Sequence, residues 1–407
     1  MSVFVIIAVA IIALVVMLRF KVPLGPAIFG SGLILWVFTN PAPHLIWDAA
    51  VQMVTQSRTW DLLAALYFVV CLEIELRKSG CLAGMVEYLK QLTPNKKISL
   101  AVMPAFLGLL PSIGGARFSA PIVEKVAQGE TISENRLAAI NFWFRHIFEF
   151  SSPIVPGMIL ACAIAQVPVG TVIMHLAWLT AAAFILGWLV LLAGVKLKPE
   201  ARPEISKQEL SKERHDFALS FSPIIFALIL MLAFGLNAGV AMGITSVITL
   251  AVLYICKRPV PVTEVFIGAI EKRLFRDVFC IFLFIALLDV TGVMPQIVKA
   301  VTGAPLSTYW IIAILSFIVG VLTGLSQGHV AIVMPIVAAI APGNLDLLSI
   351  ALVCGVGGQM LTPTHMCLII TLNYFKADFF KTLWPCFICQ TALFILFGLS
   401  VWLFPAA

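Results

Sequence analysis

Long apolar runs separated by short polar stretches make up most of the chain. A helix that crosses the hydrocarbon core of a bilayer needs about 20 mainly apolar residues, with a range of about 17 to 25. Runs of this kind predict membrane-crossing helices. They cover residues 2–18, 24–40, 60–76, 171–195, 217–236, 238–256, 383–404 and, with its flanks, 278–288.

Two other regions hold apolar runs in pairs, and each run is too short to cross. A pair of short runs around a Ser/Gly turn predicts a re-entrant hairpin that dips into the membrane and returns to the same side. The two hairpins cover 98–127, with Ser112, Gly114 and Gly115 at its tip, and 308–341, with Ser326 and Gly328 at its tip.

Two further runs are long enough to cross but contain a proline near the middle. Proline lacks a backbone donor and pushes the preceding residue away from helical geometry, so each run predicts a broken helix. The broken helices cover 137–165, interrupted at Ser151, Ser152 and Pro153, and 347–374, interrupted at Thr362, Pro363 and Thr364.

The chain also resembles itself. A shift of 214 residues aligns Ser112 with Ser326, a shift of 212 aligns Gly80 with Gly292, and a shift of 210 aligns Glu149 with Gln359. Several matches in the same order and at nearly the same shift indicate an internal repeat. We therefore expect an all-α polytopic membrane protein of two repeats, 1–195 and 217–407, joined by a polar linker, 196–216. Each repeat has five crossings, one of them broken, and one hairpin, and the odd number of crossings inverts the second repeat.

Composition agrees with a lipid environment. Hydrophobic residues make up 61% of the 407 residues and charged residues 11%, and the mean hydropathy is +1.07, which excludes a water-soluble fold. The net charge of +6 does not indicate nucleic-acid binding, because the cations stand between apolar runs and form no basic face. The nine cysteines show no metal-ligand spacing, so no metal or other cofactor is predicted.

The cations predict the orientation. The repeat plan places the linker cations and most loop cations on one side, and only Arg58 and Lys299 on the other. The positive-inside rule makes the crowded side cytoplasmic. The sequence thus predicts a multi-pass protein of the cell inner membrane with both termini in the periplasm.

This arrangement resembles the ion transporter superfamily, which includes divalent anion–sodium symporters, gluconate and C4-dicarboxylate carriers and TRAP large membrane subunits. The segment Leu-Pro-Ser-Ile-Gly-Gly-Ala-Arg-Phe-Ser-Ala-Pro at 110–121 is similar to an uncharacterised prokaryotic membrane-protein family within that group. The resemblance implies an elevator-type carrier that forms a homodimer. The Ser-Asn-Thr triplets that mark sodium sites in the anion–sodium symporters are absent here, which leaves Na+ and H+ both open as the coupling ion.

Candidate site residues follow from the hairpin tips and helix breaks, because irregular backbone at membrane depth must be buried in protein or line a cavity. Arg117, beside the first tip, is the leading candidate to bind an anion, and its alternative is a permanent ion pair with Glu149. His146 and Glu149, spaced i, i+3, favour proton relay or structural pairing over metal binding. The remaining substrate candidates are Ser112, Gly114, Gly115, Ser326, Gly328, His329, Thr362 and Thr364, and the candidates for ion or proton coupling are Glu149, Ser151, Ser152, His146, Gln359 and His365.

The predicted function is a secondary active transporter for a small organic anion, a carboxylate, coupled to Na+ or H+. A Na+/H+ or other ion antiporter, and the membrane subunit of a TRAP-like carrier with an external binding protein, are the alternatives. An intramembrane enzyme is disfavoured because the sequence contains no His-Glu-x-x-His or Gly-x-Ser-x-Gly motif. The sequence leaves the substrate, the coupling ion and the direction of transport open.

The orientation can be tested by thiol labelling. A single Cys placed in the 196–216 linker of an otherwise Cys-free protein should react only with a membrane-permeant maleimide in intact cells. Reaction with an impermeant maleimide would contradict the inverted arrangement.

Overall fold

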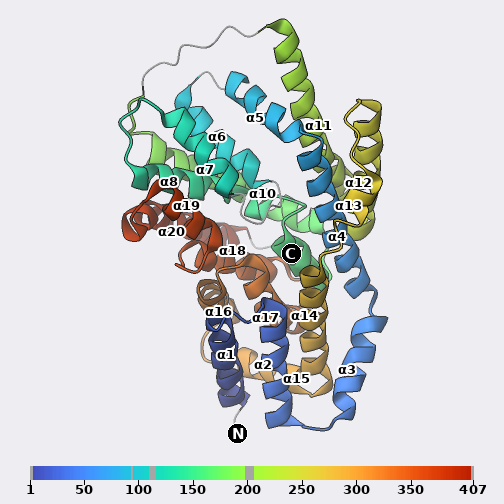
Figure 1. Ribbon diagram of the computed structural model, residues 1–407. Helices are drawn as coiled ribbons and strands as arrows, with labels where there is room; N and C mark the ends of the chain where they lie inside the picture. Colours follow the sequence, from blue (N-terminus) through green and yellow to red (C-terminus); the bar gives the residue numbers. More distant parts are fainter. Residues whose placement is uncertain (1–2, 93–94, 110–115, 198–205, 405–407) are drawn as a thin grey trace.

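The computed structural model describes residues 3–92, 95–109, 116–197 and 206–404, and every regular element in these ranges is a helix (Figure 1). The prediction of an all-α protein is therefore confirmed.

The first part of the chain contains ten described α-helices and two short helical segments of other kinds. They are α1 (Val3–Arg19), α2 (Leu24–Thr39), α3 (His44–Thr55), α4 (Ser57–Lys78), α5 (Cys81–Leu92), α6 (Lys96–Gly108), α7 (Ala116–Ala127), α8 (Glu134–Arg145), the 3-10 helix η1 (Ile147–Phe150), α9 (Pro156–Ala165), α10 (Val169–Gly187) and the π-helix η2 (Trp188–Leu192).

Ten more described α-helices follow Ser206. They are α11 (Lys207–Leu232), α12 (Ala238–Ile255), α13 (Val262–Phe266), α14 (Lys272–Val290), α15 (Val293–Thr302), α16 (Thr308–Thr323), α17 (Ser326–Ile340), α18 (Leu345–Met360), α19 (Met366–Phe375) and α20 (Phe379–Leu403).

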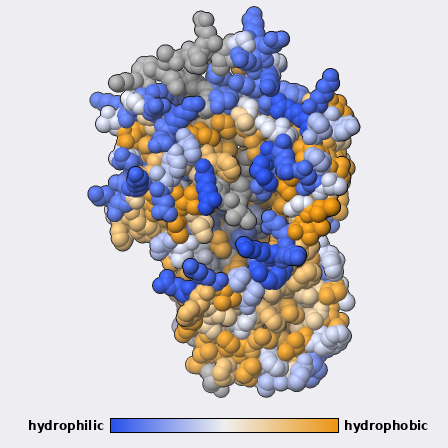
Figure 2. All heavy atoms as spheres, viewed as in Figure 1, coloured by the Kyte–Doolittle hydropathy of each residue, from blue (hydrophilic) through white to orange (hydrophobic). Residues whose placement is uncertain are grey.

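Several of these helices are built to lie in a membrane. Among the described residues, four helices are long and apolar enough to cross, namely α10 with η2, α11, α12 and α20. The pair α14 and α15 passes the same test together but bends by 79° between its members, so α15 leaves the direction of α14. Apolar side chains cover much of the visible face around α1, α2 and α14, whereas polar ones gather at the end that holds α5 and α11 (Figure 2). The protein is thus embedded in a membrane.

The predicted linker is partly helical. Ser206 caps α11: its hydroxyl accepts a hydrogen bond from the backbone N–H of Glu209, and the Glu209 carboxylate accepts one from the Ser206 N–H. This reciprocal capping box fixes the start of a helix. Consequently α11 begins at Lys207, ten residues before the apolar run that predicted it.

The second hairpin turns earlier than predicted. Gly324 has a φ of +63° and ends α16 in the left-handed conformation that glycine adopts most readily. The turn is therefore at Gly324 and Leu325, and Ser326 and Gly328 belong to the first turn of α17. The predicted tip of the first hairpin, at Ser112, Gly114 and Gly115, lies outside the described residues.

The first helix break also begins earlier than predicted. Helix α8 ends at Arg145, the chain tightens into η1, and α9 starts at Pro156. Glu149 therefore lies in a 3-10 turn, and its predicted i, i+3 spacing from His146 on a continuous α-helix is wrong. Pro153 cannot donate to a helical carbonyl, and a tighter 3-10 turn before it satisfies part of the released backbone.

Glycine allows α16 and α18 to pack backbone against backbone. A Cβ on Gly358 of α18 would lie 2.2 Å from the carbonyl oxygen of Phe317, and a Cβ on Gly320 of α16 would lie 2.2 Å from that of Gly355. Neither contact leaves room for a methyl group. These close approaches set the position of α18, which leads into the second break.

We expect Gly358→Ala to destabilise the protein, because its Cβ meets a backbone carbonyl that cannot move aside. Overpacking of this kind costs about 1–3 kcal/mol, which a lowered thermal unfolding temperature in detergent would register. Gly398→Ala in α20 is the matched control, because a Cβ there meets nothing within 4 Å. The control should be neutral or slightly stabilising. Equal unfolding temperatures for the two variants would contradict the packing account.

Candidate functional site

The two helix breaks meet at a pair of histidines. His146 follows the last residue of α8, and His365 precedes the first residue of α19. Their Nε2 atoms are 3.1 Å apart although the residues are 219 positions apart in the chain. The rings are nearly perpendicular, with an interplanar angle of 87°, and both side chains are buried. The breaks thus form one site and not two.

Backbone carbonyls hold both rings. The Nδ1 atom of His146 lies 2.7 Å from the carbonyl oxygen of Phe142, and that of His365 lies 2.9 Å from the carbonyl oxygen of Gln359. These carbonyls belong to the last turns of α8 and α18. The Phe142 ring packs against both imidazoles. Each ring therefore has a fixed orientation, with Nε2 facing the other ring.

Arg145 adds a buried positive charge beside the pair. Its side chain is 6% exposed, and its Nη1 donates a hydrogen bond of 3.1 Å to the carbonyl oxygen of Leu107. The guanidinium also lies against the thiol of Cys367 and close enough to Glu149 to interact with its charge. A buried cation needs such partners or a bound anion. Arg145 is absent from the predicted site residues, although its place directly before His146 in an apolar stretch was a usable signal.

Glu149 and Gln359 face each other across the breaks. The Gln359 side chain, which is 1% exposed, donates a hydrogen bond to the Glu149 carboxylate. These are the two positions that the self-comparison aligned. The side-chain oxygen of Gln359 has no hydrogen-bond partner within the described ranges. The predicted coupling residues His146, Glu149, Gln359 and His365 therefore do come together.

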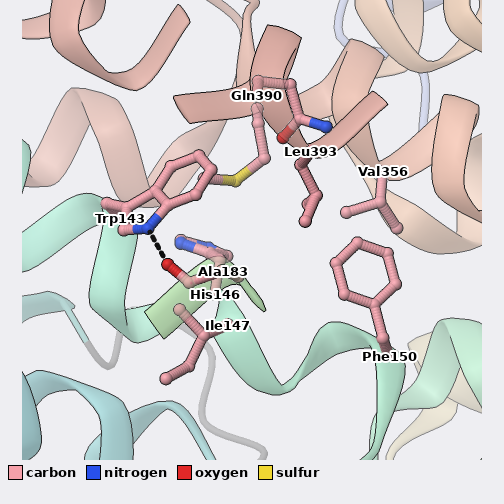
Figure 3. Close-up of a pocket in the computed structure, with 9 residues that line it drawn as sticks. Trp143, His146, Ile147, Phe150, Ala183, Val356, Gln390 and Leu393 are labelled. Atoms are coloured by element: carbon pink, nitrogen blue, oxygen red, sulfur yellow. Dashed lines mark hydrogen bonds between the residues drawn. The ribbon is translucent and has the colours of Figure 1, made fainter. Parts of the chain in front are cut away.

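A small cavity adjoins His146. It has room for about 10 Å³, roughly the volume that one water needs. Trp143 forms part of its wall, with its indole N–H donating to the carbonyl oxygen of Ala183 at 2.9 Å (Figure 3). Gln390 of α20 also lines the cavity, and its buried Nε2 has no partner among the described residues. The cavity can therefore hold one small polar species beside the histidine pair.

The hydroxyls at the breaks mainly satisfy nearby groups. The Ser151 hydroxyl lies 2.7 Å from that of Thr180, and the Ser152 hydroxyl accepts a 3.4 Å hydrogen bond from the backbone N–H of Ile154. Thr362 and Thr364 bond to each other through their hydroxyls at 3.0 Å. These residues stabilise the irregular backbone of the two breaks.

The second hairpin contacts the first break. A Cβ on Gly157, in the first turn of α9, would lie 2.6 Å from the Ser326 Cβ, so the two backbones are close. Gly328 lies equally close to Thr323. His329 is fully buried with its ring against Gly355, where a Cβ would lie 2.0 Å from the ring. The structure thus places His329 in a packing position and not in the histidine pair.

Arg117 lies away from the buried pair. It is exposed, in the first turn of α7, and has no ion pair with Glu149 or with any other described carboxylate. The alternative of a permanent Arg117–Glu149 ion pair is wrong. Arg145, and not Arg117, supplies the cation near Glu149.

We expect Arg145 and Glu149 to be energetically coupled. Arg145→Met should lower the unfolding temperature because it leaves the Glu149 carboxylate without its cation, and adding Glu149→Gln should recover part of the loss. Coupling between neighbouring groups amounts to about 0.5–3 kcal/mol. Glu134→Gln, at the exposed start of α8, is the control and should combine additively with Arg145→Met. An additive Glu149→Gln would contradict the coupling.

Comparison with known proteins places the chain in one family. The family described as "Protein of unknown function (DUF401)" matches residues 1–403. No curated protein matches the chain. Because the match covers nearly all of the sequence, the chain is a member of the DUF401 family.

Proposed function

We propose that this protein is a secondary active transporter that moves a small organic anion across the cell inner membrane. It would consist of two inverted repeats and work by an elevator mechanism as a homodimer, as the resemblance to the ion transporter superfamily implies. The single observation that carries the proposal is the meeting of two helix breaks, one from each half of the chain, around the buried cation Arg145.

Backbone conformation supports the repeats. Left-handed residues recur at the shifts found in the sequence, between 210 and 214 positions apart. The pairs are Lys21 and Gly235, Gly80 and Gly292, Gly129 and Gly343, and Gln166 and Lys376. A positive φ is uncommon, especially outside glycine. Four recurrences in the same order are difficult to explain without a common unit.

Helix packing supports the repeats as well. Helix αn of the first ten corresponds in order to helix αn+10 of the second ten. Helices that pack together in one pair have counterparts that pack together in another. Thus α4 packs on α12, and their counterparts α14 and α2 pack on each other. The same holds for α9–α17 with α19–α7, and for α5–α11 with α15–α1. Such exchange is what a two-fold relation between halves produces. The neighbours Glu149 and Gln359 would lie near its axis.

The position of the hairpins fits the inverted arrangement. In Figure 1 the pair α6 and α7 lies toward the end that holds α5 and α11, whereas α16 and α17 lie toward the end that holds α1 and α15. Two hairpins that approach one central site from opposite ends could serve as its two gates. A simple pore requires neither gates nor broken helices.

Charge favours an anion as cargo. Helix N-termini carry positive partial charge, and in transporters the N-termini of half-helices face anionic groups. Here α9 and α19 begin at the breaks, and α7 begins next to the exposed Arg117. Arg145 is buried at the junction of the breaks, and Arg117 is exposed at the first hairpin, so an anion would meet a cation at each of these two positions.

An ion antiporter is the second candidate. Glu149 favours it, because a carboxylate held by Gln359 at the junction of the breaks could load and release Na+ or H+. In the proposed symporter the same carboxylate would carry the coupling ion. The part of the chain that the structure describes has no feature that selects a TRAP-like subunit over a carrier that works alone.

The test is uptake of radiolabelled small carboxylates into proteoliposomes under imposed Na+ or H+ gradients. Arg117→Ala should weaken apparent affinity roughly ten- to a hundredfold, the loss expected for a charge-assisted hydrogen bond. Arg136→Ala, an exposed arginine near the start of α8, is the matched control and should transport like wild type. No uptake above that of empty liposomes under either gradient would contradict the proposal.

A further inference from the structure

We propose that His146, His365 and Cys367 bind a soft monovalent metal ion, Cu+. The two Nε2 atoms and the cysteine Sγ lie within 4.8 Å of one another. His146 comes from the first helix break, and His365 and Cys367 come from the second, so only the fold brings the three ligands together. The site lies at the same junction of breaks that the proposed transport function uses, but metal binding does not require that function.

The hydrogen-bonding pattern of the histidine pair requires an electron-pair acceptor. A carbonyl oxygen only accepts hydrogen bonds, so the contacts of 2.7 and 2.9 Å place an N–H on the Nδ1 atom of each ring. Two neutral imidazoles then have no proton left for the Nε2 atoms, whose lone pairs face each other at 3.1 Å. This contact is repulsive unless a third positive species binds between the rings.

A metal ion fits this requirement better than a third proton. Histidines that bind metals usually donate their other ring N–H to a carbonyl or carboxylate, which fixes the ring and the tautomer. Both histidines have this arrangement. In addition, the Sγ of Cys367 provides a third metal ligand. A proton shared between the two Nε2 atoms would not need a third ligand.

Helix ends favour a cation at the same point. The carbonyls of Phe142 and Gln359 lie in the last turns of α8 and α18, so the negative ends of two helices border the rings. The cavity of about 10 Å³ beside His146 leaves room for one water.

The charges select the ion. Arg145 contacts the Cys367 thiol and is close to both histidines, so its charge opposes a divalent ion. A metal ion deprotonates the thiol that coordinates it. Cu+ with one thiolate is neutral, which leaves the charges of Arg145 and Glu149 to balance each other. Thiolate and imidazole are also ligands suited to Cu+.

The test is Cu+ binding to purified wild-type protein in detergent, under reducing conditions and in competition with a Cu+ chelator. We expect one ion per chain and an X-ray absorption spectrum with nitrogen and sulfur neighbours. Cys367→Ser and His365→Ala should each weaken binding at least tenfold. Binding should also raise the thermal unfolding temperature of wild type and not that of Cys367→Ser, whose metal-free stability shows whether it folds.

Two controls exclude other thiols. The Cys386→Ser/Cys389→Ser variant removes the only Cys-x-x-Cys motif in the sequence, and Cys280→Ser removes a half-buried thiol of α14. Both should bind like wild type. Binding that depends on Cys386 and Cys389, preference for Zn2+ over Cu+, or no stoichiometric binding would each overturn the proposal.

Discussion

A backbone group that leaves a helix inside a bilayer loses its hydrogen bond, and hydrocarbon provides no replacement. This constraint governs the centre of the molecule. Two helices are interrupted by proline, so their released carbonyls and amides must find partners within the protein. Released amides donate to nearby hydroxyls, and released carbonyls accept from the two histidine rings. The meeting of the two breaks follows from the requirement that neither can face lipid.

The same requirement concentrates charge. Four helix ends come together here, namely the C-termini of α8 and α18 and the N-termini of α9 and α19. Because C-termini carry negative and N-termini positive partial charge, charges of both signs border one small volume. Arg145, Glu149 and the two histidines are tolerated there because each has a polar partner. Close packing around the centre depends on glycines such as Gly108, where a Cβ would lie 1.9 Å from the carbonyl oxygen of Arg145. Polar chemistry and tight helix packing are thus parts of one arrangement.

Much of the fold could be predicted from the sequence, because apolar run length and proline position act locally. The second break lies at Thr362 as expected, between α18 and α19. Helix ends were less predictable where capping outweighs hydropathy, as at Ser206 and Gly324.

The site was predictable only in part. Glu149 and Gln359 followed from the self-comparison, but the pairing of His146 with His365 did not, since no periodicity says which breaks will touch. Arg145 was missed although its place directly before His146 was a usable signal. Its partner Leu107 is on another helix, and the sequence does not reveal that contact.

The central claim is that the two breaks face each other, and crosslinking Glu149 to Gln359 tests it most directly. A Cys-free protein with Glu149→Cys, Gln359→Cys and a protease site in the 196–216 linker would be treated with a short thiol crosslinker and then cleaved. The account predicts that the two halves stay joined on a denaturing gel, whereas the Glu149→Cys single variant separates. Separation of the halves in the double variant would contradict it.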